Sequence, residues 1–252
     1  MPCKENVATQ LLYRCDAYLR EFEAEVLKVV KQDNSFGVVL DRTAFYPGGG
    51  GQPADWGVIK GRRGEIKVVN VQRTENMIVH VASQIFGKIE RGDHVKGVLD
   101  WNRRYALMRN HTTAHLMAEA VRKALGAPVK IVSSAVEVKK ARLDFNYDGS
   151  LKPFFSKIEE AANRVVEEDR KVIVKVMPRK KAERYVKRFH ESLKILPPQV
   201  QEVRIVEVQD WHACACGGTH VKSTGELGRV KILGRRSKGK GVERVEFASE
   251  KP

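Results

Sequence analysis

Short apolar runs separated by turn residues occupy the first hundred positions of the chain. The runs Glu25–Val30 and Gly37–Leu40 flank Asp33-Asn34-Ser35, a spacing typical of a β-hairpin. Further runs of the same kind are Ile66–Val71, Met77–Val81 and His94–Leu99. Evenly spaced strands with almost no helical periodicity predict a small antiparallel β-barrel.

The pattern changes near Asp100. From Arg103 to Leu125 apolar residues recur with the period of an α-helix, and Gly126 is a stop signal. The later patterns predict helices at Pro153–Arg170 and Arg179–Glu191, and strands at Lys130–Val138, Arg142–Phe145, Val172–Met177, Val203–Val208, Gly228–Leu233 and Val242–Phe247. This mixture indicates an α+β fold. We expect two domains, a β-barrel over residues 1–99 and an α+β domain over residues 100–252.

The chain is strongly basic. Its 252 residues include 46 lysines and arginines against 31 aspartates and glutamates, a formal charge of +15. Such a surface attracts phosphate, so nucleic acid is the favoured partner class. The basic clusters are Arg103-Arg104, Arg109, Arg179-Lys180-Lys181, Lys187-Arg188 and Arg235-Arg236 with Lys238 and Lys240.

Neither a membrane partner nor an oxidising compartment is expected. No run approaches the roughly 18 apolar residues of a membrane span. The cysteines Cys3, Cys15, Cys214 and Cys216 form a poor disulfide framework for a chain of this size. The sequence therefore predicts a cytoplasmic protein.

Two motifs far apart in the sequence carry the residue types of a metal site. The HTTAH motif places His111 and His115 one turn apart on one face of the predicted helix. The CGGTH motif adds Cys216 and His220, held close by two glycines. Each histidine alone could be an ordinary core residue, but together the motifs offer the four nitrogen and sulfur ligands that zinc prefers.

The role of this metal stays open at this point. Four protein ligands make a closed, structural site, whereas a catalytic zinc keeps a position open for water or substrate. His212 or Cys214 could also replace one of the ligands. HTTAH lacks the glutamate that serves as general base in the zinc-protease pattern HExxH, and no catalytic residue is predicted.

A glycine-rich segment, FYPGGGGQP at Phe45–Pro53, allows two interpretations of equal weight. In the first, the glycines serve only to relieve steric crowding in a tight turn. Alternatively, a backbone without side chains lets a ligand approach closely. No Gly-Lys-Ser/Thr follows, so the segment is not a P-loop.

These motifs together resemble a known family. The run Leu107–Leu116, followed far downstream by CGGTH, resembles the editing domain of alanyl-tRNA synthetases and the free-standing AlaX-type alanyl-tRNA editing proteins. The opening Asp16–Phe22 and the FYPGGGGQP segment look like the medium-length AlaX class. Arg142–Phe145 and Thr224–Gly228 resemble further family segments, so the resemblance extends from about Leu11 to Phe247.

The resemblance implies a zinc-dependent hydrolase that removes a wrong amino acid, chiefly serine and possibly glycine, from alanine tRNA. A pocket shaped for alanine rejects such amino acids poorly, and a second, hydrolytic site corrects the error. Carried over residue by residue, the zinc ligands would be His111, His115, Cys216 and His220. The residues Gly48, Gly49, Gly50, Gly51 and Gln52 would border the pocket for the tRNA 3′ end.

The chain also departs from the synthetase pattern. Ile131 stands where the synthetase editing domain typically has a glutamine, so contact with serine would come from Thr112 or Ser134. The doubled Cys214-Ala215-Cys216 is not a synthetase feature. No ATP-binding signature is visible, so no nucleotide cofactor is expected and the protein would act in trans. The alternatives are a non-catalytic RNA-binding protein in which zinc staples the fold, and a zinc hydrolase of another small ester. No oligomeric state is predicted.

Overall fold

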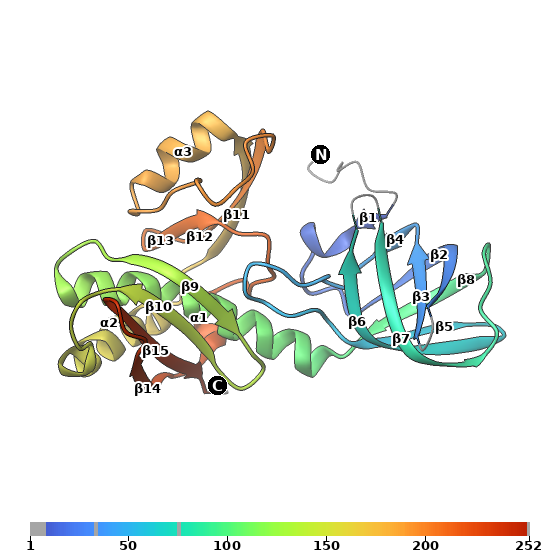
Figure 1. Cartoon of the computed structure of the whole chain (residues 1–252), viewed down its shortest axis with the longest axis horizontal. Coiled ribbons are helices and arrows are strands. Elements are labelled where there is room, and N and C mark those ends of the chain that lie inside the picture. Colours follow the sequence, from blue (N-terminus) through green and yellow to red (C-terminus); the bar gives the residue numbers. More distant parts are fainter. Residues whose placement is uncertain (1–8, 33–34, 75–76, 251–252) are drawn as a thin grey trace. The chain divides into compact units, whose positions relative to one another are not determined.

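A computed structural model describes residues 9–32, 35–74 and 77–250 of the chain (Figure 1). The chain divides into two compact units. One unit contains the residues up to Gly49 together with Pro53–Tyr105, and the other contains Gly50–Gln52 and the residues from Ala106 onward. The glycine-rich segment is therefore divided between them.

The first unit is a closed β-barrel with the strand order β2-β3-β7-β6-β5-β8, and every neighbouring pair is antiparallel. Its strands are β2 (Glu21–Gln32), β3 (Ser35–Leu40), β5 (Gly57–Gly61), β6 (Gly64–Arg73), β7 (Ile78–Gly87) and β8 (His94–Leu99). Two short segments, β1 (Gln10–Leu11) and β4 (Arg42–Thr43), pair in parallel, and η1 (Leu12–Arg14) is a 3-10 turn. The predicted barrel is confirmed, while the turn at Asp33-Asn34 lies outside the described residues.

The barrel is filled by the inward side chains of alternating positions, including Val26, Val38 and Ile59. Arg104 is also fully buried, and its guanidinium donates hydrogen bonds of 2.9–3.0 Å to Asp55. A buried charge needs such a partner. The prediction that Arg104 belongs to a phosphate-binding surface cluster is therefore wrong.

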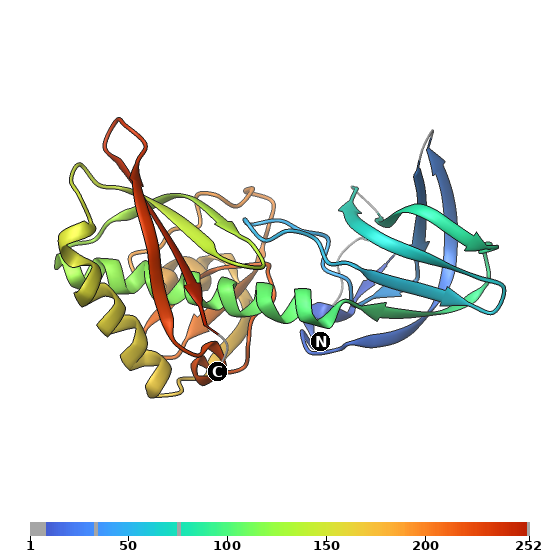
Figure 2. The same ribbon diagram turned by 90° about the horizontal axis from the view of Figure 1, so that it is seen from below.

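The second unit combines α-helices with two antiparallel sheets, which confirms the predicted α+β class. One sheet has the order β14-β15-β10-β9 and the other β11-β12-β13. Figure 2 shows α2 and the β14–β15 hairpin next to α1. The elements are α1 (Trp101–Leu125), whose residues from Ala106 onward belong to this unit, β9 (Lys130–Val136), β10 (Ala141–Asn146), η2 (Lys152–Phe154), α2 (Phe155–Glu167), β11 (Val172–Pro178), α3 (Arg179–Lys187), β12 (Glu202–Val208), β13 (His212–Ala215), η3 (Thr224–Leu227), β14 (Val230–Ser237) and β15 (Val242–Ser249).

The helix α1 is the central element of the second unit. Asp100 caps its start, because the Asp100 carboxylate accepts the backbone N–H of Arg103 at 3.0 Å. The sequence predicts one buried face, yet every residue from Leu107 to Ala118 is buried. Polar residues on the other faces have hydrogen-bond partners: Nη2 of Arg109, for example, donates to the carbonyl of Leu227 at 2.6 Å. Arg109 is thus also wrongly predicted as a surface phosphate ligand.

Other differences from the predicted elements are small. The strands β5 and β13 are additional. Helices α2 and α3 end earlier than predicted, and Asp169 and His190, shortly beyond their ends, have positive φ angles of 47° and 58°. A left-handed residue at this position ends a helix.

Two predictions concerned the cysteines and the membrane. Cys214 and Cys216 are free thiols. Cys15 is disulfide-bonded, so the expectation against disulfides is wrong for this residue, and Cys3 lies outside the described residues. Among the helices of the described residues, none has the length and apolar character needed to span a membrane.

Candidate metal centre

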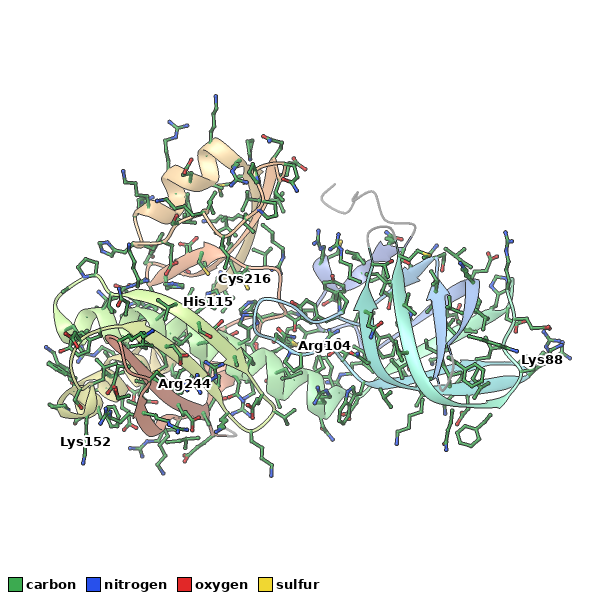
Figure 3. All side chains as sticks on the ribbon, in the orientation of Figure 1. Lys88, Arg104, His115, Lys152, Cys216 and Arg244 are labelled. Carbon is green, nitrogen blue, oxygen red and sulfur yellow. The ribbon has the colours of Figure 1, made fainter. Side chains whose placement is uncertain are left out.

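The four side chains of the HTTAH and CGGTH motifs meet in the second unit. Donor atoms of His111, His115, Cys216 and His220 all lie within 4.8 Å of one another. The histidines of the first motif project from α1, and the second motif follows directly after β13. Figure 3 shows His115 and Cys216 side by side. Segments separated by about a hundred positions in the sequence thus build one cluster of metal-ligand types.

The spacing of the donor atoms fits a tetrahedral metal ion. The Cys216 Sγ lies 3.5 Å from His111 Nε2 and 3.3 Å from His220 Nε2. With bonds of about 2.3 Å to sulfur and about 2.0 Å to nitrogen, a tetrahedral zinc separates its ligand atoms by roughly 3.3–3.6 Å. The residues present therefore fit an ion of this kind.

Gln52 holds His111 in the orientation that a metal ligand needs. Its Oε1 lies 2.7 Å from His111 Nδ1 and also accepts the backbone N–H of Thr219 at 3.1 Å. Because a backbone N–H can only donate, this contact identifies Oε1 as the acceptor oxygen, and Nε2 donates to the Thr219 hydroxyl at 2.8 Å. His111 Nδ1 must therefore carry the proton, and Nε2 presents its lone pair toward Cys216.

Thr112 fixes the orientation of His220 in a similar way. The Thr112 hydroxyl donates to the carbonyl of Met108 at 3.0 Å and accepts the backbone N–H of Val221 at 3.3 Å. His220 Nδ1 lies 3.1 Å from the same oxygen, which has no second proton to give. His220 is therefore protonated at Nδ1, and its Nε2 faces Cys216.

The third histidine, His115, contacts residues outside the two motifs. Its Nδ1 lies 3.3 Å from Nδ1 of His212, the first residue of β13. The Nε2 of His212 lies 3.2 Å from Oε1 of Glu191. The thiol of Cys214 lies 4.0 Å from His115 Nε2, so His115, His212 and Cys214 form a second, overlapping group of donor atoms.

The charge states of these groups suit cation binding. Burial lowers the pKa of His111 to about 4, and burial also lowers the pKa values of His115 and His220. Burial alone would raise the pKa of the Cys216 thiol. The hydrogen bond and charge of His115, together with the charge of Arg204, outweigh this effect and lower that pKa. Loss of the proton that Cys216 and His115 share would leave neutral imidazoles and a thiolate, which are the forms that bind a metal ion.

Cys214 differs from Cys216 in this respect. Burial and the neighbouring charge of Cys216 raise the pKa of Cys214 well above its ordinary value. Arg204 also donates to the backbone carbonyl of Cys216 at 2.6 Å. Because the thiolate is the ligand form, Cys216 suits the metal position better than Cys214.

The glycines of the CGGTH motif have unequal roles. A Cβ on Gly218 would lie 2.2 Å from Cε1 of His111, 2.5 Å from its Nδ1 and 2.8 Å from Oε1 of Gln52. A Cβ on Gly217 would meet no atom within 4 Å. Only Gly218 therefore lets the backbone pass directly against the His111–Gln52 pair.

The four-glycine segment has a clear steric basis. Gly48, Gly49, Gly50 and Gly51 all have positive φ, at 77°, 128°, 57° and 87°. Side-chain-bearing residues rarely adopt such angles. Gly48 and Gly49 belong to the barrel unit, whereas Gly50 and Gly51 belong with Gln52 to the unit of the metal centre.

Ser134 is placed beside this segment. The carbonyl of Gly51 accepts the backbone N–H of Val136 at 2.8 Å, which fixes the segment to the end of β9. A Cβ on Gly51 would lie 2.9 Å from the Ser134 hydroxyl. Both Ser134 and Gly51 are exposed, while Gln52 and Thr112 are buried.

The predicted site residues thus separate by location. The four predicted ligands converge, and Gln52 and Thr112 contact two of them from behind, so these two contacts orient ligands. Ser134, Gly50 and Gly51 lie at the surface. The sequence suggested His212 only as an alternative ligand and gave no sign of the contacts of Glu191 and Arg204, because no local motif connects them to His212 or Cys216.

The sequence of the chain is similar to those of known proteins. Residues 11–103 match the family model for class II (A) tRNA synthetases, and residues 203–246 match that for the threonyl and alanyl tRNA synthetase second additional domain. An alanine–tRNA ligase of Ignicoccus hospitalis is 41% identical over 243 residues, which cover 96% of this chain and 26% of the ligase. The chain therefore spans about a quarter of the length of such ligases.

Shorter relatives match along their whole length. The alanyl-tRNA editing protein AlaX-M of Methanosarcina acetivorans is 40% identical over 245 residues, covering 95% of this chain and 98% of the relative. That of Methanosarcina mazei is 38% identical over 246 residues, covering 95% and 96%. Identity at this level over both full lengths shows common descent and a common fold. The chain belongs to the family of AlaX-M alanyl-tRNA editing proteins.

Proposed function

We propose that this chain is a zinc-dependent deacylase that acts in trans, in the cytoplasm, on alanine tRNA mischarged with serine or glycine. The observation that carries the proposal is the convergence of His111, His115, Cys216 and His220 in a chain that matches editing proteins of the AlaX-M family from end to end. The editing activity in the names of these relatives supports the reaction. The donor set supports the metal.

The chain's own residues would hold the ion and define the side from which substrate approaches. Nε2 of His111 and of His220 is unprotonated and faces Cys216. A bound zinc ion would supply positive charge to position the aminoacyl ester or to acidify a water molecule. Gly217, next to the half-buried Cys216, is exposed and carries no side chain, which leaves this side of the cluster accessible.

Ser134 is the better candidate for recognition of the serine hydroxyl. Thr112 is fully buried, and its hydroxyl proton is already donated to Met108. Ser134 is exposed and lies against Gly51, one residue before Gln52, the partner of His111. A hydroxyl that binds the seryl ester but not the alanyl ester would favour hydrolysis of the mischarged tRNA over the correctly charged one.

A basic surface on α3 suits the tRNA backbone. The helix packs on the β11–β13 sheet (Figure 1) through the buried Ala182 and Val186, so its other face is turned to solvent. We name as the α3 cations the exposed side chains Lys180, Lys181, Arg184 and Lys187. Within the part of the chain that the structure describes, these four form no ion pair. Unneutralised cations on one face attract phosphate.

Release of serine from Ser-charged and of glycine from Gly-charged alanine tRNA tests the proposal, beside an Ala-charged control and with or without a zinc chelator. We expect release from the seryl and glycyl esters, but not from the alanyl ester, and we expect the chelator to stop it. Cys216→Ala should abolish release, whereas Cys214→Ala is the matched control and should keep it. Absence of release by the zinc-loaded wild-type protein would refute the proposal.

Two alternatives remain distinguishable by the same assay. Four protein ligands also suit a structural zinc. Bound tRNA without ester hydrolysis would then identify a non-catalytic RNA-binding protein. Hydrolysis of free seryl esters at the rate of charged tRNA would identify a hydrolase of small esters.

A further inference from the structure

We propose that His212 and Glu191 position His115 for the metal by fixing which nitrogen of its ring carries the proton. The inference rests on the metal centre of the proposed function and assigns to it two residues outside both ligand motifs. It concerns the third histidine of the cluster, which neither Gln52 nor Thr112 contacts in the way that they contact His111 and His220.

The contacts form one chain from a carboxylate to the metal cluster. Oε1 of Glu191 lies 3.2 Å from Nε2 of His212, and Nδ1 of His212 lies 3.3 Å from Nδ1 of His115. The rings of His212 and His115 meet edge to face, at 5.1 Å between centroids and 87° between planes. His212 and His115 are 2% and 5% exposed, so water has little access to either contact.

The direction of each hydrogen bond follows by elimination. Glu191 also accepts a hydrogen bond of 2.6 Å from Arg122, and an ionised carboxylate has no proton to donate. His212 Nε2 must therefore be the donor to Glu191. In a neutral imidazole the other nitrogen is then an acceptor, so His212 Nδ1 accepts a proton from His115 Nδ1. His115 is left with an unprotonated Nε2, the nitrogen that can bind a cation beside Cys216.

The far end of this chain is anchored to the helix that carries His115. Arg122 lies two turns further along α1 and also donates to the carbonyls of Phe189 and Val129, at 3.0 and 3.2 Å. Arg122 thus connects α1 to two residues of the segment after α3, Phe189 and Glu191. All three histidines of the cluster are then held from behind in the same tautomer, by an amide, a hydroxyl and an imidazole.

A second metal ion is the competing explanation for these contacts. Donor atoms of His115, His212 and Cys214 also lie within 4.8 Å of one another. The positioning role is favoured because the Nε2–H of His212 is used by Glu191, which leaves His212 Nδ1 as the acceptor for His115. A cation there would also have to displace the proton between His115 and His212.

Two substitutions at His212 separate a positioning role from mere packing. His212→Asn keeps an acceptor close to the place of Nδ1, whereas His212→Leu keeps the bulk but has no acceptor. The full-length protein is loaded with Zn²⁺ or Co²⁺. Metal affinity is measured by chelator competition, the Co²⁺ absorption bands report ligand geometry, and long-range ¹H–¹⁵N spectra of the zinc-loaded protein identify the tautomers of His115 and His212.

We expect one metal ion per chain, with His115 protonated at Nδ1. His212→Leu should lower zinc affinity by about 10- to 100-fold and alter the cobalt bands, the usual range for losing a partner of a metal-binding histidine. His212→Asn should recover most of this loss. Equal affinity of wild type and both variants would overturn the inference, and so would a second ion per chain that Cys214→Ala removes.

Failure of this inference can be told apart from failure of the proposed function, because metal binding is measured without tRNA. A wild-type protein that binds zinc with the expected tautomers but releases no serine would refute only the deacylase proposal. A protein that releases serine while His115 carries its proton elsewhere would refute only the positioning role.

Discussion

Replacement of Gly218 by alanine should damage the metal centre while sparing the rest of the fold. The added Cβ would lie 2.2 Å from Cε1 of His111 and 2.8 Å from Oε1 of Gln52. Ordinary contact begins near 3.4 Å, so the ring or the backbone must move by about 1 Å. Nothing flexible can yield, because His111, Gln52 and Thr219 are all buried and bonded to one another.

The size of the effect follows from two separate costs. Overpacking of a tight site typically costs about 1–3 kcal/mol of stability. Displacing the Gln52 amide removes the acceptor for His111 Nδ1, and loss of such a partner lowers metal affinity by about 10- to 100-fold. We therefore expect Gly218→Ala to bind zinc about 10- to 100-fold more weakly and to lose most deacylation at limiting zinc.

Gly217→Ala is the matched control, because a Cβ at Gly217 meets no atom within 4 Å. Zinc affinity is measured for both variants by chelator competition, and stability by urea unfolding in the presence of chelator, which separates the two costs. If Gly218→Ala bound zinc as tightly as Gly217→Ala, the assigned contact between the CGGTH backbone and the His111–Gln52 pair would be wrong.

Three further predictions follow from other parts of the molecule. Ser134→Ala should lower kcat/KM for the seryl ester about 10-fold, which corresponds to the free energy of one hydrogen bond, and should leave kcat/KM for the glycyl ester unchanged. An equal decrease for both esters in the deacylation assay would contradict a role in serine recognition. Neutralising the α3 cations should raise KM for charged tRNA and reduce the slope of log affinity against log salt by about 3. Neutralising the same number of barrel residues (Arg62, Lys67, Lys88 and Arg91) should change neither quantity. Filter binding at several salt concentrations measures the slope. Burial lowers the pKa of His80 in the barrel from 6.5 to about 4, so the unfolded chain takes up a proton that the folded chain excludes. The free energy of unfolding is unaffected by this group above pH 6.5 and should decrease by about 3 kcal/mol as the pH falls to 4. Urea unfolding of His80→Gln across this range should show a weaker pH dependence than that of the wild type.

Local patterns predicted the barrel well and also pointed to the four residues that converge in the candidate metal centre, for physical reasons. A short apolar run bounded by turn residues is a property of each strand alone, and five of the six barrel strands carry such a run. The sixth, β5, has glycine at both ends, Gly57 and Gly61, which weakens its signal. The HTTAH motif of the candidate metal site was equally easy to recognise in the sequence, because His111 and His115 share a helix face by spacing alone.

What the sequence did not reveal depends on contacts between distant residues. Arg104 and Arg109 look like surface cations, but their acceptors, Asp55 and the Leu227 carbonyl, lie 49 and 118 positions away. The family resemblance placed Gln52 at the border of the substrate pocket but gave no sign of its bond to His111, which spans 59 positions. Partners at such separations are set by the topology of the fold and leave no local pattern.

The grouping of Gly50–Gln52 with the metal centre has a consequence for the modularity of this protein. The unit that contains the four candidate metal ligands is not continuous in sequence, since it takes three residues from the middle of the segment that otherwise forms the barrel unit. A gene fragment encoding only the residues after the barrel would retain every ligand and lose the amide that orients His111. Recombination or truncation at the apparent domain boundary would therefore transfer the metal ligands without the complete metal site.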